Sequence, residues 1–377
     1  MELVIDALAA GGDGVGRDDD GRVTFVPATA PGDRARVQLG RVTSSYAHAE
    51  LVEVIAPGPS RVAPVCPQVA RGCGGCAWQH VARAAQLAAK QGFVERGLRA
   101  LAGLRVHPVD DPCPPLGWRR RARFHVRGGE VGLYARASHR LVVVDGCPQL
   151  EPALAAAYAE VVAARPPDGE LAMLVNDRGE VAVATMATWP AAKALVGRGG
   201  IVATGGDDID LDGGRATAFD FAQASTAGNA AIRSRAVAAV GAPPTAGAVL
   251  LELHAGGGNL TRGYRAAGWR VVASDLATRA ELVGDAADVL AAQAGPFAAI
   301  ALDPPRTGAA DAMPGVIRHA PDVVVYVACD VATLARDAAR LVAAGYRATD
   351  AWPIDAMPQT AHVEVVLRLV RDSVAAP

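Results

Sequence analysis

Residues 249–275 read VLLELHAGGGNLTRGYRAAGWRVVASD. The largely apolar run at 249–253 predicts a buried strand, and a glycine-rich turn and a helix from Leu260 follow it. The next strand, at 271–275, ends in an acid. This order of strand, glycine turn, helix and closing acid predicts the nucleotide-binding unit of a doubly wound sheet. Because the turn lacks G-x-G-x-x-G, we expect it to bind a mononucleoside such as S-adenosylmethionine rather than a dinucleotide.

Two further apolar runs, at 298–302 and 323–327, predict buried parallel strands. Asp303 directly follows the first run, Cys329 lies just after the second, and Glu364 closes a third polar cluster. Polar residues at the carboxyl ends of such strands line the ligand crevice of open α/β sheets, so we expect these three to meet at one edge. The alternative is that Cys329 is an ordinary core cysteine, which the acid directly after it disfavours.

The C-terminal part of the chain, residues 216–377, therefore predicts a Rossmann-like domain. Its remaining elements are helices and strands that alternate along the sequence. We expect helices near 226–240, 311–319 and 332–344, and strands at 346–352 and 362–371.

Bulk composition is that of an ordinary globular protein, with 51% hydrophobic and 20% charged residues among 377. The sequence has no secretory signal and no apolar run long enough to cross a bilayer, so we expect a cytoplasmic protein without membrane contact. Residues 1–150 carry 19 Lys and Arg against 14 Asp and Glu, and the remainder carries 18 against 25. A basic N-terminal part followed by an acidic C-terminal part fits a polyanion-binding module joined to a catalytic one. The alternative is that the charge difference arises from chance variation in composition.

Residues 1–60 predict a small β-barrel. Short runs at 3–7, 22–26, 34–39 and 48–55 alternate with turn clusters, of which the glycines at 11–16 are the clearest. Small barrels of this kind commonly bind oligonucleotides, and a purely structural barrel is the alternative.

Closely spaced cysteines open the central part of the chain, residues 61–215. Cys66, Cys73 and Cys76 fall within eleven residues. Thiolates select zinc or iron–sulfur clusters, and a fourth ligand is needed. Cys147, in a Gly/Pro turn after an apolar strand, is a better candidate than Cys113. A four-Cys set with a distant fourth member suits a [4Fe–4S] cluster, while zinc and free structural thiols remain alternatives.

The same central part holds interleaved arginines at 119–127 beside aromatic residues. Arg119, Arg121 and Arg123, with Trp118, Phe124 and Tyr134, could follow a phosphate backbone and stack on bases. A solvated strand face is the alternative. We therefore predict a β-rich central domain that contributes to RNA binding.

In combination these segments resemble the TRAM-domain, iron–sulfur-containing RNA uracil-5 methyltransferases, a family that modifies 23S ribosomal RNA and transfer RNA. The resemblance spans nearly the whole chain and rests on six segments in order, CPQVARGCGGC at 66–76, FAQ at 221–223, ELHAGGGN at 252–259, DPPRTG at 303–308, YVACD at 326–330 and PQTAHVE at 358–364. It implies a TRAM barrel at 1–60, a cluster-bearing domain at 61–215 and a methyltransferase domain at 216–377.

The resemblance also implies roles for single residues. Cys329 stands where the family has its nucleophile, which adds to C6 of uracil, and Glu364 stands where it has the base that removes the C5 proton. Arg306 is expected at the uracil carbonyl, and Cys147 as the fourth cluster ligand. The expected S-adenosylmethionine-binding residues are Gln223, His254, Gly256, Gly258, Asn259, Asp275, Asp285 and Asp303. The expected partner is RNA, bound by a monomer, with the target base flipped out of its stack.

Several positions depart from the family pattern. The nucleophile segment has Asp330 and Val331 after the cysteine where the family has Asn and Pro, and His254 replaces an aromatic residue. Asp275 replaces a glutamate, and the stretch from it to Asp303 is unusually short. These departures leave two alternatives: an iron–sulfur RNA-binding paralogue with lost or altered activity, and a methyltransferase with another acceptor in which Cys329 is structural.

Overall fold

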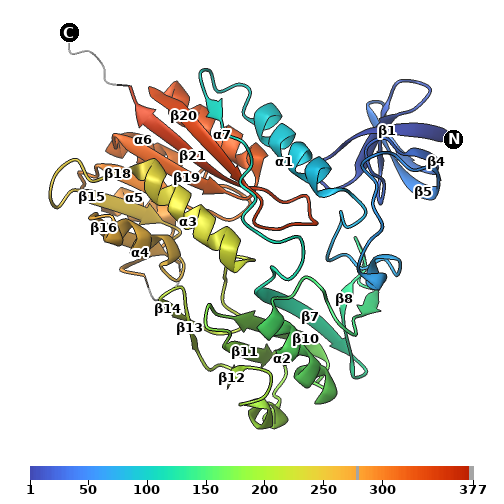
Figure 1. Ribbon diagram of the computed structural model, residues 1–377. Helices are drawn as coiled ribbons and strands as arrows, with labels where there is room; N and C mark the ends of the chain where they lie inside the picture. The colour runs from blue at the N-terminus through green and yellow to red at the C-terminus, as the bar shows by residue number, and fades with distance from the viewer. Residues whose placement is uncertain (277–279, 373–377) are drawn as a thin grey trace.

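The computed structural model describes residues 1–276 and 280–372, and its N-terminal part is a closed barrel (blue in Figure 1). The strands pair in the order β1-β2-β3-β5-β4. Leu3, Ile5 and Val37 fill the interior because every second side chain of a strand points inward. The strands are β1 (Glu2–Leu8), β2 (Gly14–Arg17), β3 (Val23–Val26), β4 (Arg34–Val42) and β5 (Tyr46–Ala56).

Strand β2 lies where the sequence predicts a turn. The expected turn at 11–16 ends at Asp13, and Gly14 begins the strand. A Cβ atom on Gly14 would lie 2.0 Å from Thr29 Oγ1, and one on Gly16 would lie 2.3 Å from the Val4 carbonyl oxygen. These two glycines therefore allow close packing of the barrel wall, and this explains why glycine content alone misplaced the strand.

A second sheet forms the central part, at the bottom of Figure 1, in the order β12-β11-β10-β7-β8-β9. Helix α2 (Pro152–Ala163) packs on it through Leu154 and Val161. Its strands are β7 (Arg121–Arg127), β8 (Glu130–Tyr134), β9 (Leu141–Val143), β10 (Gly169–Val175), β11 (Val181–Thr185) and β12 (Ile201–Thr204). Nearby are the 3-10 turns η1 (Pro67–Val69) and η2 (Pro190–Leu195) and the hairpin β13 (Ile209–Leu211) and β14 (Gly214–Ala216).

The C-terminal part is the predicted doubly wound sheet. Its order is β17-β16-β15-β18-β19-β21-β20-β6, and β21 runs antiparallel to both of its neighbours. The strands are β15 (Val249–Leu253), β16 (Arg270–Asp275), β17 (Leu282–Val283), β18 (Ala299–Leu302), β19 (Val323–Ala328), β20 (Tyr346–Ile354) and β21 (Glu364–Arg371).

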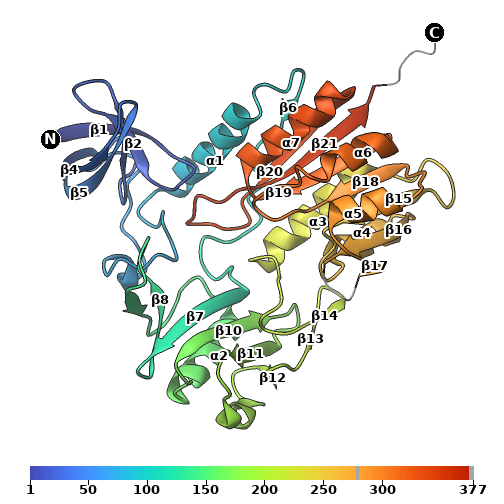
Figure 2. The ribbon, with the colours of Figure 1, turned by 180° about the vertical axis from the view of Figure 1, so that it is seen from behind.

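Helices cover both faces of this sheet (Figure 1 and Figure 2). On one face lie α3 (Thr226–Val240) and α4 (Asn259–Ala266), and on the other lie α5 (Ala286–Ala292), α6 (Met313–His319) and α7 (Val331–Ala343). The continuous apolar strands are buried between these layers, which is the usual situation of a mostly parallel sheet. Among the described residues, no helix combines the length and apolarity needed to cross a membrane.

Two elements from early in the chain complete the C-terminal sheet. Helix α1 (Arg83–Gly97) packs against α7 and β20 through Val94, and Leu98 follows it into the same core. Strand β6 (Arg105–Val106) pairs in parallel with β20. The region that links the cysteines to the central sheet is therefore built into the C-terminal part.

The opposite edge of the sheet is short, as the sequence predicts for the stretch after Asp275. Strand β17 has two residues, and Leu282 and Val283 pair with Ser274 and Asp275 of β16. Residues 277–279 of the connecting stretch lie outside the described residues.

Candidate active site

Cys329 and Glu364 lie side by side at one edge of the C-terminal sheet. Ala328, the last residue of β19, pairs with Val365 of β21, and Cys329 and Glu364 come next beyond this pair. Because β21 is antiparallel, its amino end reaches the edge at which the parallel strands end. Asp303 follows β18 at the same edge. The structure thus brings together the acid, the thiol and the second acid.

Local backbone structure holds Cys329 in a turn before α7. Asp330 is the N-cap of that helix, and its carboxylate accepts a hydrogen bond from the Thr333 backbone N–H at 2.9 Å. A helix amino terminus carries partial positive charge, which favours a thiolate at this position. Asp330 therefore caps the helix that follows the cysteine.

A buried hydrogen-bond network ties β19 to the loop that follows Asp303. Tyr326 Oη donates to Asp337 Oδ2 at 2.8 Å, and the Ala309 backbone N–H donates to the same carboxylate oxygen at 2.8 Å. Asp337 is fully buried on α7. A Cβ atom on Gly308 would lie 2.6 Å from that carboxylate oxygen, so the loop needs glycine to approach it. The network fixes the loop relative to the strand of Cys329.

Burial and mutual repulsion set the acid–base properties of the three groups. Burial, with the charge of Asp303 in support, raises the pKa of Glu364 to about 8, and Glu364 is only 5% exposed. Burial alone raises the pKa of Asp303 to about 7. Burial and the charge of Glu364 raise the pKa of Cys329 to about 11. Each of these groups therefore retains its proton to a higher pH than an exposed group of the same kind.

Arg306 brings a positive charge to this edge. Its charge lowers the pKa of both Cys329 and Glu364, against the larger effect of burial. Its guanidinium lies 3.1 Å from His362 Nδ1 and 3.2 Å from Nε2. Burial and the charge of Arg306 lower the pKa of His362 to about 4, so the neutral ring accepts from the guanidinium. His362 therefore orients Arg306 over the site.

The glycine-rich turn after β15 forms the second part of the site. His254 (φ 59°), Gly256 (φ 53°) and Gly258 (φ 78°) all have left-handed backbone, and Gly258 is the N-cap of α4. A Cβ atom on Gly256 or Gly257 would meet no atom within 4 Å, so this turn borders open space. Asn259 exchanges side-chain hydrogen bonds of 2.6 and 3.1 Å with Asn229 of α3. The turn is thus anchored on one side and open on the other.

Acids of the neighbouring strands support this turn. Asp275 Oδ2 accepts from the Gly256 backbone N–H at 2.8 Å, and its carbonyl oxygen accepts from Gly284 at 3.0 Å. Asp285 is the N-cap of α5 and accepts from the Ala287 backbone N–H at 2.9 Å. The expected contact residues His254, Gly256, Gly258, Asn259, Asp275 and Asp285 therefore cluster around one turn.

Several buried polar atoms around this turn have no protein partner among the described residues. They are Glu252 Oε2, His254 Nε2, Thr261 Oγ1, Tyr264 Oη and Ser274 Oγ. Burial raises the pKa of Glu252 to about 8. Such groups normally find a partner in water or a ligand. The remaining expected contact residue, Gln223, lies in the loop before α3, and its carbonyl oxygen accepts from Arg120 Nε at 2.9 Å.

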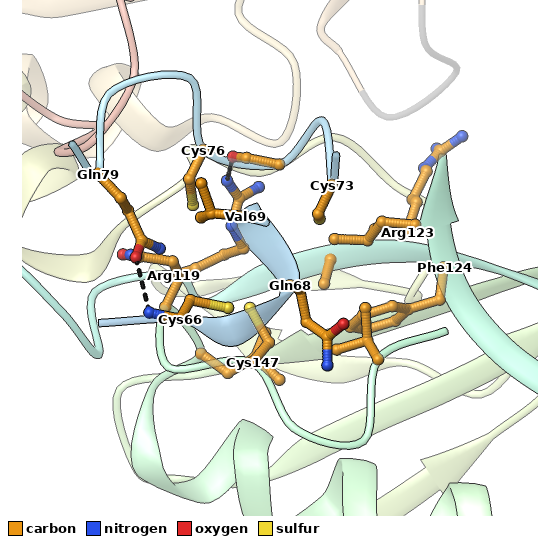
Figure 3. Close-up of a pocket in the computed structure, with 16 residues that line it drawn as sticks. Cys66, Gln68, Val69, Cys73, Cys76, Gln79, Arg119, Arg123, Phe124 and Cys147 are labelled. Atoms are coloured by element: carbon orange, nitrogen blue, oxygen red, sulfur yellow. Dashed lines mark hydrogen bonds between the residues drawn. The ribbon is translucent and has the colours of Figure 1, made fainter. Parts of the chain in front are cut away.

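Four cysteines line one cavity between the loop at 66–76 and the central sheet (Figure 3). They are Cys66, Cys73, Cys76 and Cys147. Gln79 Oε1 accepts from the Cys66 backbone N–H at 3.0 Å and holds the start of the loop. Burial raises the pKa of Cys76 to about 11. Cys113 lies elsewhere and donates from its thiol to Ser225 Oγ at 3.3 Å.

The arrangement of these thiols can be compared with the ligand geometry of two kinds of metal centre. Among the described residues, no group of three or more His, Cys, Asp or Glu side chains is placed to hold a metal ion. A zinc ion needs its four ligands at one point. A [4Fe–4S] cluster is bulkier and takes one thiolate at each iron, so its ligands surround a cavity. The cavity lined by Cys66, Cys73, Cys76 and Cys147 is consistent with the second arrangement.

Comparisons with known proteins identify the family. Residues 1–52 match the TRAM domain. The 23S rRNA (uracil(1939)-C(5))-methyltransferase RlmD of Halomonas elongata is 34% identical over 435 residues, covering 98% of this chain and 89% of its own. The chain belongs to the family of RNA (uracil-C5)-methyltransferases. An RNA methyltransferase of Gloeobacter violaceus is 33% identical over 443 residues, covering 98% of this chain and 96% of its own.

A solved structure supports the fold of this methyltransferase. The Pyrococcus abyssi tRNA (uracil-54, C5)-methyltransferase, solved in complex with S-adenosyl-L-homocysteine, superposes with a TM-score of 0.75. The match covers 98% of this chain and 100% of that one at 20% identity. The predicted combination of a small N-terminal barrel and a methyltransferase fold is confirmed.

The arginines predicted to bind RNA make contacts within the methyltransferase. Arg119 borders the cysteine cavity, and its guanidinium lies 3.5 Å from the Gly75 carbonyl oxygen (Figure 3). Arg121 donates to the Ala222 carbonyl oxygen at 3.3 Å, and Arg123 donates to Glu170 at 3.0 Å. Arg123 is exposed and Arg121 is partly buried.

Two of the three aromatic residues proposed to stack on bases are unsuited to that role. Trp118 is 2% exposed and Phe124 is 1% exposed, because both side chains point into the protein core. Tyr134 is partly exposed and stacks on His125 with ring centroids 3.7 Å apart. The expectation of stacking by Trp118 and Phe124 is therefore wrong.

Sequence reasoning missed several polar residues that surround the site. Gln86 and Lys90 are fully buried on α1, and Asp355 is fully buried just before the segment that carries Glu364. Asp337 is buried beside the loop of Asp303. A buried Gln or Lys in a helix of mixed composition has no distinct sequence signal, so these positions become visible only in the fold.

Proposed function

We propose that this methyltransferase modifies C5 of a uridine in RNA through a covalent bond between Cys329 and C6 of the base. The observation that carries the proposal is the pairing of a thiol and a buried carboxyl group at the end of adjacent strands β19 and β21. C5 of uracil is a weak nucleophile, so addition at C6 is needed to activate it.

In the first step Cys329 Sγ forms a bond to C6, and the electron pair of the C5–C6 double bond moves toward the O4 carbonyl. Arg306, which His362 orients, stabilises the negative charge that develops there. The amino terminus of α7 and the charge of Arg306 favour the thiolate, while burial and Glu364 oppose it. We therefore expect Cys329 to react only when a bound uracil excludes water and its O4 carbonyl is polarised.

In the last step Glu364 removes the proton from C5. The electron pair of the C5–H bond reforms the C5–C6 double bond, and the C6–Sγ bond breaks to return the Cys329 thiolate. A carboxylate with a pKa of about 8 is a far stronger base than an exposed one, which suits this step near neutral pH. Its burial also keeps water away from the adduct.

S-adenosylmethionine, when bound, would supply the methyl group from its positively charged sulfonium. The C5–methyl bond would form as the sulfonium–methyl bond breaks, and S-adenosylhomocysteine would be the leaving group. The open turn at Gly256 and the unpartnered atoms of His254 and Ser274 fit such a ligand. We propose that Gln223, His254, Gly256, Gly258, Asn259, Asp275, Asp285 and Asp303 hold it. The carboxylate of Asp303, like that of Glu364, gains stability beside a cation.

We further propose that Cys66, Cys73, Cys76 and Cys147 bind a [4Fe–4S] cluster. The chain's own groups support this assignment, since Arg119 faces the same cavity and its charge lowers the pKa of Cys73, Cys76 and Cys147 against the effect of burial. The cluster would hold the loop at 66–76 to the central sheet. Zinc remains the competing metal, and metal analysis decides between the two.

Methyl transfer to RNA tests the proposed function. We expect tritium from labelled S-adenosylmethionine to appear in 5-methyluridine of bulk RNA from a strain lacking the protein, and Cys329→Ala to abolish it. RNA containing 5-fluorouridine should form an adduct that survives denaturing gels, because fluorine cannot leave C5 as the proton does. Label in another nucleoside, or an adduct that persists in Cys329→Ala, would contradict the mechanism. Separate ribosomal and transfer RNA pools identify the substrate class.

A further inference from the structure

Helix α1 contacts the segment that leads into Glu364. This segment, residues 355–361, forms the first part of the connection between β20 and β21 and contains Gln359, whose backbone is left-handed (φ 64°). A residue other than glycine rarely adopts this conformation unless its surroundings enforce it. Something in the fold must therefore hold the segment in place.

Gln86 is the residue of α1 that holds Gln359. Its Oε1 accepts from the Gln359 backbone N–H at 3.0 Å, and its Nε2 donates to Gln359 Oε1 at 2.8 Å. The same Nε2 lies 2.8 Å from the Val81 carbonyl oxygen and 3.1 Å from that of Trp78. Gln86 is fully buried, so these bonds form away from water and are geometrically specific.

Two further contacts fix the ends of the same segment. Lys90 Nζ donates to Asp355 Oδ1 at 2.5 Å and to the Met357 carbonyl oxygen at 3.2 Å, and Arg83 pairs with the other oxygen of Asp355. Lys90 and Asp355 are both fully buried. The Gln359 carbonyl oxygen accepts from the Trp78 backbone N–H at 3.0 Å. Residues 355, 357 and 359 of the segment are therefore all bonded to residues that come before the central sheet in the sequence.

The barrel is connected to the same point. Trp78 Nε1 donates to the Gly12 carbonyl oxygen of the β1–β2 turn at 3.0 Å. Leu8, Trp78 and Phe93 share one apolar cluster, against which Ala361 packs. Figure 1 shows α1 lying between the barrel and the C-terminal sheet.

We propose that Gln86 is a positioning residue for Glu364, and that it acts through the main chain of Gln359. The inference rests on the proposed function, because it assumes that Glu364 removes the C5 proton. Glu364 lies five residues beyond Gln359 and is the first residue of β21, where it pairs with Ile354 of β20. Residues 355–363, which precede it, have no regular structure. Displacement of these residues shifts the start of β21 and the carboxylate with it, whereas Cys329 lies between β19 and α7, which the segment does not join.

This difference predicts which step fails when Gln86 is changed. Formation of the Cys329–C6 bond and methylation of C5 do not require the base. Removal of the C5 proton does, and a displacement of about 1 Å at a reacting group can cost about 100-fold in rate. A methylated RNA–enzyme adduct should therefore accumulate in the variant.

The experiment measures the two steps separately in single-turnover reactions on unmodified RNA. Full-length Gln86→Met, close in volume to the parent, is expected to form methylated adduct at the parental rate and to release 5-methyluridine RNA about 100-fold more slowly. Gln91→Ala is the matched control, because Gln91 lies on the same helix and donates to Glu95 at 2.7 Å. Equal slowing of both steps, or release at the parental rate, would overturn the proposal.

A second variant keeps the test decisive if Gln86→Met unfolds. Gln359→Gly accepts the left-handed backbone, but it loses the side-chain bond to Gln86 and gives the main chain at residue 359 more conformational freedom, so it should trap the same adduct. Glu364→Gln calibrates the readout. If Glu364→Gln traps the adduct and the Gln86 and Gln359 variants do not, only the positioning role fails. If Glu364→Gln releases product normally, the assignment of the base fails, and the positioning role fails with it.

Discussion

Cys329 and Glu364 are neighbours because the strands that present them run in opposite directions. Ala328 and Val365 pair at the end of the β19–β21 ladder, and the thiol and the carboxyl lie just beyond. A parallel β21 would carry Glu364 to the far edge of the sheet. The closeness has an electrostatic cost, since the charge of Glu364 raises the pKa of Cys329. The ionisation of Cys329 and the ionisation of Glu364 are therefore linked.

Arg306 should set the pH dependence of the reaction. The proposed mechanism requires ionised Glu364 and Cys329, whose pKa values are raised, so kcat/KM should rise with pH through the neutral range. Arg306→Gln removes the cation that lowers both pKa values. We expect its profile to move to higher pH and its maximal kcat to fall about 100-fold. A pH series with the surface variant Arg347→Gln as control checks this, and an unshifted profile would argue against the assigned role.

Glu364 should make stability decrease as pH rises. Burial raises its pKa from 4.5 to about 8 in the folded state, so between these values the folded chain holds a proton that the unfolded chain releases. The free energy of unfolding therefore falls over this window. Glu364→Gln should not show this loss. From pH 5 to pH 8, the free energy of unfolding of the parent should therefore fall by roughly 2–4 kcal/mol relative to that of the variant. Urea unfolding at both pH values measures it, with the exposed Glu130→Gln as control, and equal pH dependence in parent and variant would contradict the prediction.

Cys147 and Cys113 should differ in their effect on the metal content. Cys147→Ser removes one of the thiols that line the cavity, so anaerobically purified protein should lose iron, sulfide and brown colour. Cys113→Ser is the matched control and should retain them, because Cys113 bonds Ser225 instead. Parent protein with stoichiometric zinc and without iron would exclude the cluster.

Asp337 should stabilise the loop that carries Asp303 and Arg306. Asp337→Asn keeps the shape but replaces an oxygen that accepts from Tyr326 and Ala309. We expect a loss of about 1–3 kcal/mol in the free energy of unfolding. The kcat should also decrease, because the loop is no longer fixed to β19. Thermal melts and methyl-transfer assays compare it with the exposed Asp311→Asn, and identical behaviour of the two variants would disprove the role.

Much of the C-terminal fold could be predicted because its strands are nearly continuous apolar runs. The helix at 226–240 and the strand at 249–253 were predicted with the bounds that the structure has. The edge that gathers Asp303 and Cys329 followed from the rule that parallel strands end together. The family itself followed from separated motifs, and the comparisons confirm it.

The remaining features depend on packing that no local pattern encodes. Gly14 and Gly16 let β2 pack closely against Thr29 and Val4 in the barrel wall, and this contact can be seen only in the folded structure. Phe124 alternates with arginines as a solvated aromatic residue would, yet α2 covers that face. Gln86 and Lys90 are polar, so an analysis of hydrophobic periodicity places them on the outside of their helix.

The return of α1 and β6 to the C-terminal sheet has a consequence for biosynthesis. Val94 and Leu98 find their apolar partners only when α7 and β20 exist, and Asp355 meets Lys90 265 residues later in the sequence. During synthesis, helix α1 in the N-terminal half therefore lacks its packing partners until nearly the whole chain has left the ribosome. Contacts of such long sequence separation slow folding. A chain shortened at its C-terminus would lose Glu364 and would also leave its first helix without a surface to fold against.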